Sequence, residues 1–307
     1  MKHDHDHGHA HGHGHAPKDF SRAFAVGIAL NLAFVATEAT YGWLANSLAL
    51  LADAGHNLSD VLGLVLAWGA SVLARRRPSE RYTYGLRGSS ILAALANAVI
   101  LLLVTGGLAW EAMQRFDAPR PVEGGLMMAV AAVGVLVNGV TAWLFMAGGK
   151  EDLNLRGAYL HMAADAAVSL GVVVAGGLVM ATGWGWLDPA VTLAVVAVIA
   201  AGTWGLLRDS LALALQAVPG GIETAEVRAW LAGLPGVAEV HDLHIWGMST
   251  TETALTVHLV FPAGHPGDAF IGGVAHDIGH RFQIHHVTIQ VELADGGPCA
   301  LAPDHVV

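Results

Sequence analysis

The chain has 307 residues, of which 54% are hydrophobic and only 13% are charged, and its mean hydropathy is +0.53. Because soluble domains carry about 25% charged residues, this composition indicates a membrane protein with a smaller water-soluble part. The net charge of −10, without a basic face, excludes a nucleic-acid-binding protein. The single cysteine, Cys299, excludes an internal disulfide and argues against thiol metal chemistry.

The first 19 residues contain seven histidines at strict alternation, from His3 to His15. No apolar segment follows Lys2 directly, so we do not expect this segment to be a signal peptide. We expect residues 1–19 to form a disordered, His-rich cytoplasmic tail. Weak metal collection and a dispensable tail are both compatible with this composition.

Six apolar segments follow, and each reaches the roughly 20 residues that a membrane-spanning helix needs. They are residues 20–44, 47–73, 86–113, 122–147, 155–182 and 187–207. They predict a six-helix transmembrane domain over residues 20–208. With the N-terminus inside, all Lys and Arg residues except Arg115 and Arg120 fall on the cytoplasmic side, so both termini are predicted to be cytoplasmic.

After Arg208 the pattern becomes that of a soluble domain. An amphipathic helix, two alternating strands, a second helix and a last strand are predicted over residues 209–293. This order indicates a small α+β domain, and residues 294–307 are predicted to be a C-terminal tail.

Two of the apolar segments contain the same pair of polar residues, a histidine and an aspartate, which are costly to bury in a membrane. His56 and Asp60 are four residues apart, as are His161 and Asp165, and this spacing puts both side chains on one helix face. Two helices that each present an imidazole and a carboxylate can build a four-ligand site that suits Zn²⁺. The same groups bind protons in competition with the metal, which predicts metal–proton exchange.

Other polar residues in these segments have less specific interpretations. Asp53 is predicted to be a cap at the outer end of its helix, with a supporting or entry role as the alternative. Glu38 lines the pathway, carries protons or bonds to a neighbouring helix. Asn97 and Asn138 are read as hydrogen-bonding residues between helices.

Several long motifs resemble the cation diffusion facilitator family, in its bacterial zinc and cadmium exporter branch. They are "ANSLALLADAGHNLSD", "ERYTYG", "WEAMQRF", "LNLRGAYLHMAADAAVSLGVV" and "VHDLHIWGMSTTETALTVHLV". The resemblance covers about residues 20–293. It implies six transmembrane helices, a cytoplasmic ferredoxin-like domain, a homodimer in the lipid bilayer, and export of divalent metal in exchange for protons.

The resemblance also implies two metal sites. His56, Asp60, His161 and Asp165 match the transport site, and the two histidines favour zinc because the manganese branch has Asp in their place. The residues that match the metal site of the cytoplasmic domain are His241, His258, His285 and Glu292. Candidates of lower rank there are Asp242, His244, His286 and Gln290; His276 and His280 are read as a solvated pair.

Two departures from the family are visible. Leu86-Arg87-Gly88 stands where many relatives have Trp-His-Arg after the Tyr-Gly motif. The loop of residues 74–87 contains no His or Asp, so the further metal site that some relatives have there is predicted to be missing.

We therefore predict a secondary transporter, not an enzyme, in the bacterial inner membrane, with Zn²⁺ as cargo and as the ion of the cytoplasmic site. Export of Cd²⁺, Co²⁺ or Ni²⁺ is the alternative, followed by a membrane metal sensor or binding scaffold. An intramembrane metallohydrolase is disfavoured because the chain has no H-E-x-x-H motif.

Overall fold

A computed structural model of the chain describes residues 20–118, 120–146, 153–293, 297 and 299–302. The predicted N-terminal tail and most of the C-terminal tail lie outside the described residues. Six long helices come first, and their bounds are α1 Phe20–Leu44, α2 Leu48–Ala74, α3 Ser89–Asp117, α4 Gly124–Met146, α5 Leu153–Thr182 and α6 Leu187–Ala214.

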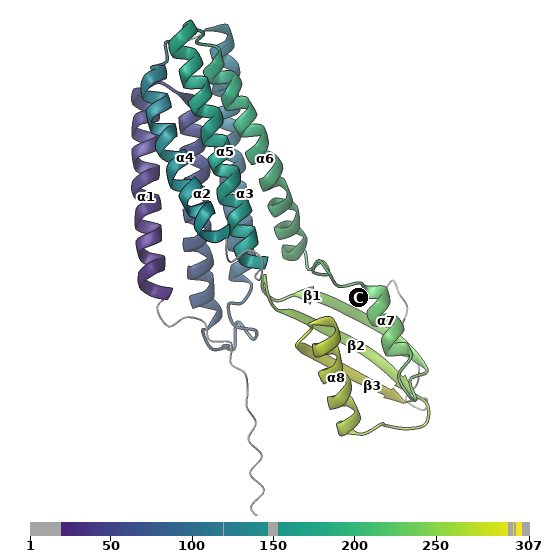
Figure 1. Cartoon of the computed structure of the whole chain (residues 1–307). Coiled ribbons are helices and arrows are strands. Elements are labelled where there is room, and N and C mark those ends of the chain that lie inside the picture. Colours follow the sequence, from purple (N-terminus) through teal and green to yellow (C-terminus); the bar gives the residue numbers. More distant parts are fainter. Residues whose placement is uncertain (1–19, 119, 147–152, 294–296, 298, 303–307) are drawn as a thin grey trace, which may run out of the picture.

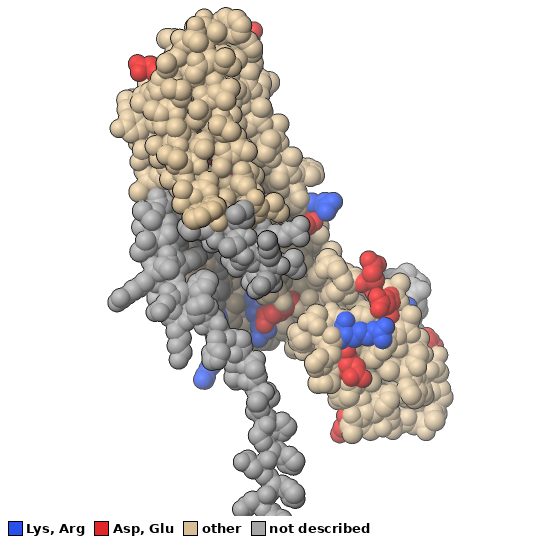
Figure 2. All heavy atoms as spheres, viewed as in Figure 1, with Lys and Arg blue, Asp and Glu red and all other residues tan. Residues whose placement is uncertain are grey.

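These helices form one elongated bundle (Figure 1). Among the described residues, α2 to α6 each contain a stretch long and apolar enough to cross a membrane. Large apolar side chains such as Leu103, Leu136 and Trp143 are mostly exposed on the bundle surface. The visible side of the bundle is almost free of charge, whereas charged side chains gather at its base and on the second domain (Figure 2). This distribution is that of a multi-pass membrane protein.

Helix α2 lies inside the bundle, where it packs against α1, α3, α5 and α6. Its N-terminus is held by polar groups at the end of the bundle away from the second domain, which we call the far end. The buried Asp188 carboxylate accepts hydrogen bonds from the Ser47 hydroxyl and the Leu48 and Ala49 amides. Arg115 places a guanidinium nitrogen 3.7 Å from the same carboxylate. A capped helix start and a buried ion pair therefore set the position of α2 along the bundle axis.

The second domain comprises α7 Thr224–Ala232, β1 Glu239–Gly247, β2 Thr253–Phe261, α8 Asp268–Phe282 and β3 His286–Leu293. The order helix, strand, strand, helix, strand agrees with the sequence prediction. The three strands form one mixed sheet in the order β1-β2-β3, with β1 antiparallel and β3 parallel to β2. Both helices pack on it through a core that includes Leu231, Leu255, Leu259, Ile278 and Ile284.

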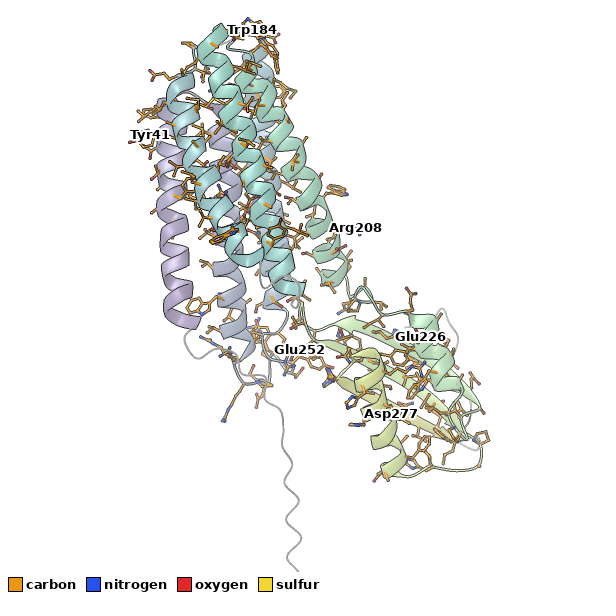
Figure 3. The ribbon with its side chains drawn as sticks, in the orientation of Figure 1. Tyr41, Trp184, Arg208, Glu226, Glu252 and Asp277 are labelled. Atoms are coloured by element: carbon orange, nitrogen blue, oxygen red, sulfur yellow. The ribbon has the colours of Figure 1, made fainter. Side chains whose placement is uncertain are left out.

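The second domain meets the bundle at the end that we call the near end. Arg87 and Glu252 form an ion pair of 2.6 Å between the two parts, and the Thr250 amide donates to the Ser90 hydroxyl. Figure 3 shows Glu252 and Arg208 at this junction and Trp184 at the far end. Each site in the bundle can therefore be ordered along the axis from the near end to the far end.

Candidate metal centres

The first candidate site lies between α2 and α5, which run in opposite directions. Antiparallel helices bring His56 opposite Asp165 and Asp60 opposite His161. One ligand atom from each of these four residues lies within 4.8 Å of every other. The structure thus brings together all four residues that the sequence indicated.

The separations between these atoms match the needs of a tetrahedral ion. His161 Nε2 lies 3.1 Å from Asp60 Oδ2 and 3.6 Å from Asp165 Oδ2. His56 Nε2 lies 3.3 Å from Asp165 Oδ1 and 3.8 Å from Asp60 Oδ2. Zn²⁺ with bonds of about 2.0–2.1 Å in tetrahedral geometry separates its ligand atoms by roughly 3.3 Å. The four side chains therefore need little movement to enclose such an ion.

The site is more open on its near-end side. The side chains of His161 and Asp60 are 44% and 37% exposed, whereas that of Asp165 is 5% exposed. A cavity of about 350 Å³ reaches Asp60 and His161 and is also lined by Asn57, Asn97 and Asn138. An ion can approach along this polar cavity without crossing the apolar packing at the far end.

Asp53 does not cap α2, so that expectation is wrong. Ser47 is the N-cap, because its hydroxyl accepts from the Leu50 amide. Asp53 lies in the second turn of α2, fully buried, and accepts a hydrogen bond of 3.0 Å from the Ser169 hydroxyl. The prediction failed because seven-residue spacing from Asp60 gives the helix face but not which residue begins the helix.

The second candidate site lies on the sheet of the second domain. His241 and His258 are direct partners in the antiparallel β1–β2 pair, and their ring centroids lie 5.3 Å apart. Both side chains are buried. Together with Glu292 and Cys299, they bring one ligand atom each within 4.8 Å of the others.

Distances in this group also suit metal ligation. Glu292 lies 3.2 Å from His241 Nε2 and 3.0 Å from His258 Nδ1. Cys299 Sγ lies 3.6 Å from His258 Nδ1, which is close to the separation of roughly 3.6 Å expected of a sulfur and a nitrogen on one tetrahedral zinc ion. Neither ring nitrogen of His241 makes a hydrogen bond of acceptable geometry, so this buried imidazole has an unused ligand atom.

Asp242 supports the group from a neighbouring position. The β1–β2 register shifts between His241 and His244, and Asp242 has a φ of 48° at this bulge. The bulge interrupts the strand alternation and allows Asp242 Oδ2 to lie 3.3 Å from His258 Nε2. His258 Nδ1 faces the group, and its other ring nitrogen lies beside the Asp242 carboxylate, an arrangement typical of metal-bound histidines.

His285 is not part of this group. It lies beside Gly279 of α8 and directly precedes β3, whose first residue, His286, pairs with Ala254. Glu292 pairs with Val260 at the other end of the same strand pair. Seven residues of extended strand separate positions by roughly 23 Å. The structure therefore brings together His241, His258 and Glu292 of the four indicated residues, without His285.

Cys299 takes the fourth place, and sequence reasoning missed it. A lone cysteine in a tail carries no spacing signal, because its neighbours in the group come from β1, β2 and β3. Its hydrogen bond to Glu292 raises the pKa of the Cys299 thiol. Partial burial opposes ionisation of Glu292, but hydrogen bonds from Cys299 and Gln290 and the nearby His241 lower its pKa below the usual range.

Two family models and several known proteins match nearly the whole chain. Residues 24–213 match the family model described as cation efflux transmembrane domain, and residues 219–294 match the one described as cation efflux protein, cytoplasmic domain. Zinc transporter ZitB of Escherichia coli is 37% identical over 89% of this chain and 87% of its own length.

Two further relatives are named for broader metal ranges. The cadmium, cobalt and zinc/H(+)-K(+) antiporter of Bacillus subtilis is 35% identical over 84% of this chain and 85% of its own length. The metal cation efflux system protein CzcD of Cupriavidus metallidurans is 35% identical over 93% of this chain and 90% of its own length.

Proposed function

Because this chain belongs to the cation efflux (cation diffusion facilitator) family, we propose that it exports a divalent metal from the cytoplasm in exchange for protons, with Zn²⁺ as the main cargo. It is a secondary transporter and not an enzyme. The relatives from Escherichia coli and Bacillus subtilis both include zinc in their names. The single observation that carries the proposal is the four-residue group of His56, Asp60, His161 and Asp165.

Charge balance explains how this group can hold its cargo inside a membrane. An isolated ion in a low-dielectric region is costly, but two ionised aspartates neutralise a dication, and two neutral imidazoles complete its shell. The loaded site is then neutral overall. Without the cargo, protons take the place of the metal on the same four side chains.

Proton coupling follows from this competition. Metal binding needs deprotonated ligands, so the cargo is released wherever protons occupy the site more readily. The polar cavity on the near-end side supports loading from that end. Helix rearrangement then exposes the site at the far end, where protons displace the metal.

This direction requires the near end to face the cytoplasm. We propose six membrane-spanning helices within residues 20–208 and cytoplasmic termini, in the bacterial inner membrane. The Lys and Arg bias of the connecting segments supports this orientation, as does the half-exposed, stacked pair of Trp184 and Trp186 at the far end. We assign residues 209–293 to a ferredoxin-like domain, supported by its two helices on a mixed sheet.

Transport by the four-residue group is tested by flux in proteoliposomes. We expect Asp60→Asn and His161→Ala to abolish proton-driven Zn²⁺ uptake, because each removes a ligand. Asp209→Asn and His276→Ala, which change exposed residues away from the group, are the matched controls and retain wild-type flux. Wild-type flux in either ligand variant contradicts the assignment of the four-residue group as the transport site. Metal binding without any flux in the wild-type protein identifies a sensor or scaffold instead.

The second domain is proposed to bind a regulatory or dimer-stabilising Zn²⁺ through His241, His258, Glu292 and Cys299. A site outside the bundle cannot itself move an ion across a membrane. Its ligands come from all three strands and from the segment after β3. A bound ion would therefore link the three strands and hold that segment against the sheet. We propose that this domain pairs with its copy in a homodimer, which fits its match to the family's cytoplasmic domain.

The role of Cys299 is testable by X-ray absorption at the zinc edge. In an Asp60→Asn background, which removes the transport site, we expect a zinc–sulfur distance of about 2.3 Å. Cys299→Ser removes this signal and weakens Zn²⁺ binding by roughly tenfold or more. His285→Ala is the matched control and leaves both unchanged. If His285→Ala loses Zn²⁺ binding while Cys299→Ser binds Zn²⁺ as wild type does, His285 and not Cys299 is the fourth ligand.

A further inference from the structure

Two buried carboxyl groups lie close together inside the bundle and have no part in the four-residue group. Glu38 of α1 and Asp53 of α2 are both fully buried. Asn57, one helical turn after Asp53 on α2, donates a hydrogen bond to Glu38, which places the two carboxyls near each other between α1 and α2. Ionised carboxylates only accept hydrogen bonds. Two of them buried close together need a proton on one of them or a cation beside them.

The partners of the pair leave room for a proton. Asn57 donates a hydrogen bond of 3.1 Å to Glu38 Oε2, and Ser169 donates one of 3.0 Å to Asp53 Oδ2. The other two oxygens, Glu38 Oε1 and Asp53 Oδ1, are buried without a partner. Among the described residues, no Lys or Arg forms an ion pair with either carboxyl. A proton on the pair turns one carboxylate into a donor and removes one of two buried charges.

The pair lies one helical turn from the transport site, toward the far end. On α2, Asp53 precedes His56 by three residues; on α5, Ser169 follows Asp165 by four. These offsets correspond to roughly 5 Å along the axis. The pair therefore lies beyond the transport site toward the far end, and Asn57, which bonds to Glu38, stands between it and the cavity that reaches Asp60 and His161.

Few other titratable groups face the pair. His56 of α2 and Asp165 of α5 are the ones whose charge reaches Asp53. Helix α4, which packs on α1, has no titratable residue, and its one amide side chain is the buried Asn138. The ionisable residues of α3 and α6 lie toward the helix ends, where Arg115 and Asp188 bind each other. The occupant of the transport site is thus the main variable charge near the pair.

We propose that Glu38 and Asp53 form a second proton-binding site. The pair releases a proton when metal binds at the transport site and takes one up when the metal leaves, and the two sites are coupled electrostatically. The proposal rests on the proposed function, because it takes the metal at His56 and Asp165 as the charge that drives the exchange. With metal bound, the pair holds one proton and carries a charge of −1. When the metal leaves toward the far end, the pair takes up a second proton from that side and becomes neutral.

Electrostatics sets the sign of this exchange. A dication about one helical turn away stabilises negative charge on the pair, and screening by water is weak at a fully buried site. Loss of that dication removes the stabilisation, so the second proton binds more tightly. Each transport cycle therefore moves one proton that the four metal ligands do not account for.

The test counts protons released when purified full-length protein binds Zn²⁺ in a weakly buffered solution. We expect the double variant Glu38→Gln/Asp53→Asn, which leaves no carboxyl in the pair, to release about one proton fewer per Zn²⁺ than wild type, with the metal still bound at His56, Asp60, His161 and Asp165. Thr40→Val is the matched control, because Thr40 lies on α1, is exposed, and bonds only to the Ala36 carbonyl. It releases the wild-type number.

An unchanged proton count in the double variant Glu38→Gln/Asp53→Asn overturns the proposal. Infrared difference spectra of wild-type protein provide a second readout that does not depend on variant folding. Zn²⁺ addition should remove a carboxylic-acid C=O band, and absence of any such band also overturns the proposal. Failure of the proposed function looks different, because Asp60→Asn would then bind and carry Zn²⁺ as wild type does.

Discussion

At the residue scale, cargo preference follows from which atoms face the ion. His56 and His161 supply nitrogen, and Asp60 and Asp165 supply oxygen. Nitrogen ligands suit Zn²⁺ and other borderline-soft ions, whereas an all-oxygen shell suits Mn²⁺ and Mg²⁺. The His56 side chain is only 20% exposed, so it also shields the ion from solvent on its side of the site.

Replacing one imidazole by a carboxylate should therefore shift the selectivity. We expect His56→Asp to weaken Zn²⁺ transport and to raise Mn²⁺ flux relative to Zn²⁺ flux by roughly tenfold. The third carboxylate also leaves a net charge of −1 around a bound dication, which is costly inside a membrane. Competition flux with Zn²⁺, Cd²⁺, Co²⁺, Ni²⁺ and Mn²⁺ measures the change. His276→Asp, on the exposed face of α8, is the control, and an unaltered order of preference in His56→Asp would refute the ligand role.

At the element scale, the close approach of α4 and α5 depends on two glycines. A methyl group added at Gly176 would lie 2.8 Å from the Gly124 carbonyl oxygen, and one added at Gly124 would lie 2.6 Å from the Gly176 carbonyl oxygen. The obstructing atoms are backbone, so the helices themselves would have to move apart. Small residues at such crossings are the usual means by which membrane helices pack without a hydrophobic driving force.

Gly176→Ala should separate α4 from α5 and displace the ligands that α5 carries. We expect a loss of about 1–3 kcal/mol in stability and a reduced Zn²⁺ affinity, because His161 and Asp165 are on the same helix. Gly171→Ala is the matched control, since an added methyl group there meets nothing within 4 Å. Thermal unfolding in detergent, together with Zn²⁺ titration, measures both effects. Equal melting temperatures for the two variants would show that the contact is not tight.

At the scale of the whole molecule, the two domains are linked by few polar contacts. The Arg87–Glu252 pair has half-exposed side chains, at 39% and 43%, so its contribution to stability is about 0–1 kcal/mol. Its position matters more than its strength. Arg87 lies two residues before α3, and Glu252 directly precedes β2, so the pair connects the bundle to the sheet that carries the second metal group.

A charge-reversal cycle tests whether this contact couples the domains. We expect Arg87→Glu and Glu252→Arg each to lower Zn²⁺ flux through repulsion, and the double variant to recover most of it. The melting temperature should change little in all three. Reversal of the exposed Arg281–Glu226 pair, which lies within the second domain, is the control. Independent, additive effects in the double variant would mean that the contact does not transmit anything between domains.

Sequence patterns by themselves determined the elements of this protein. Apolar segments of spanning length predicted the helices of the bundle, because a membrane leaves the backbone few other ways to pair its polar groups. Alternation and turn residues predicted the strands and helices of the second domain in the right order. The i, i+4 spacing of His56 with Asp60 and of His161 with Asp165 was enough to select all four members of the first group, since helical geometry keeps such pairs on one face.

Only the tertiary structure decided what lies beside what. Antiparallel packing of α2 on α5 also placed Asp53 against Ser169, and α1 brought Glu38 to the same point, which no local spacing encodes. The β1 bulge turned Asp242 toward His258, and the chain after β3 returned Cys299 to the sheet while His285 stayed at its other end. Local patterns report which face a residue occupies, because periodicity is a property of one element. Contacts between elements depend on packing and register, which are properties of the assembled fold.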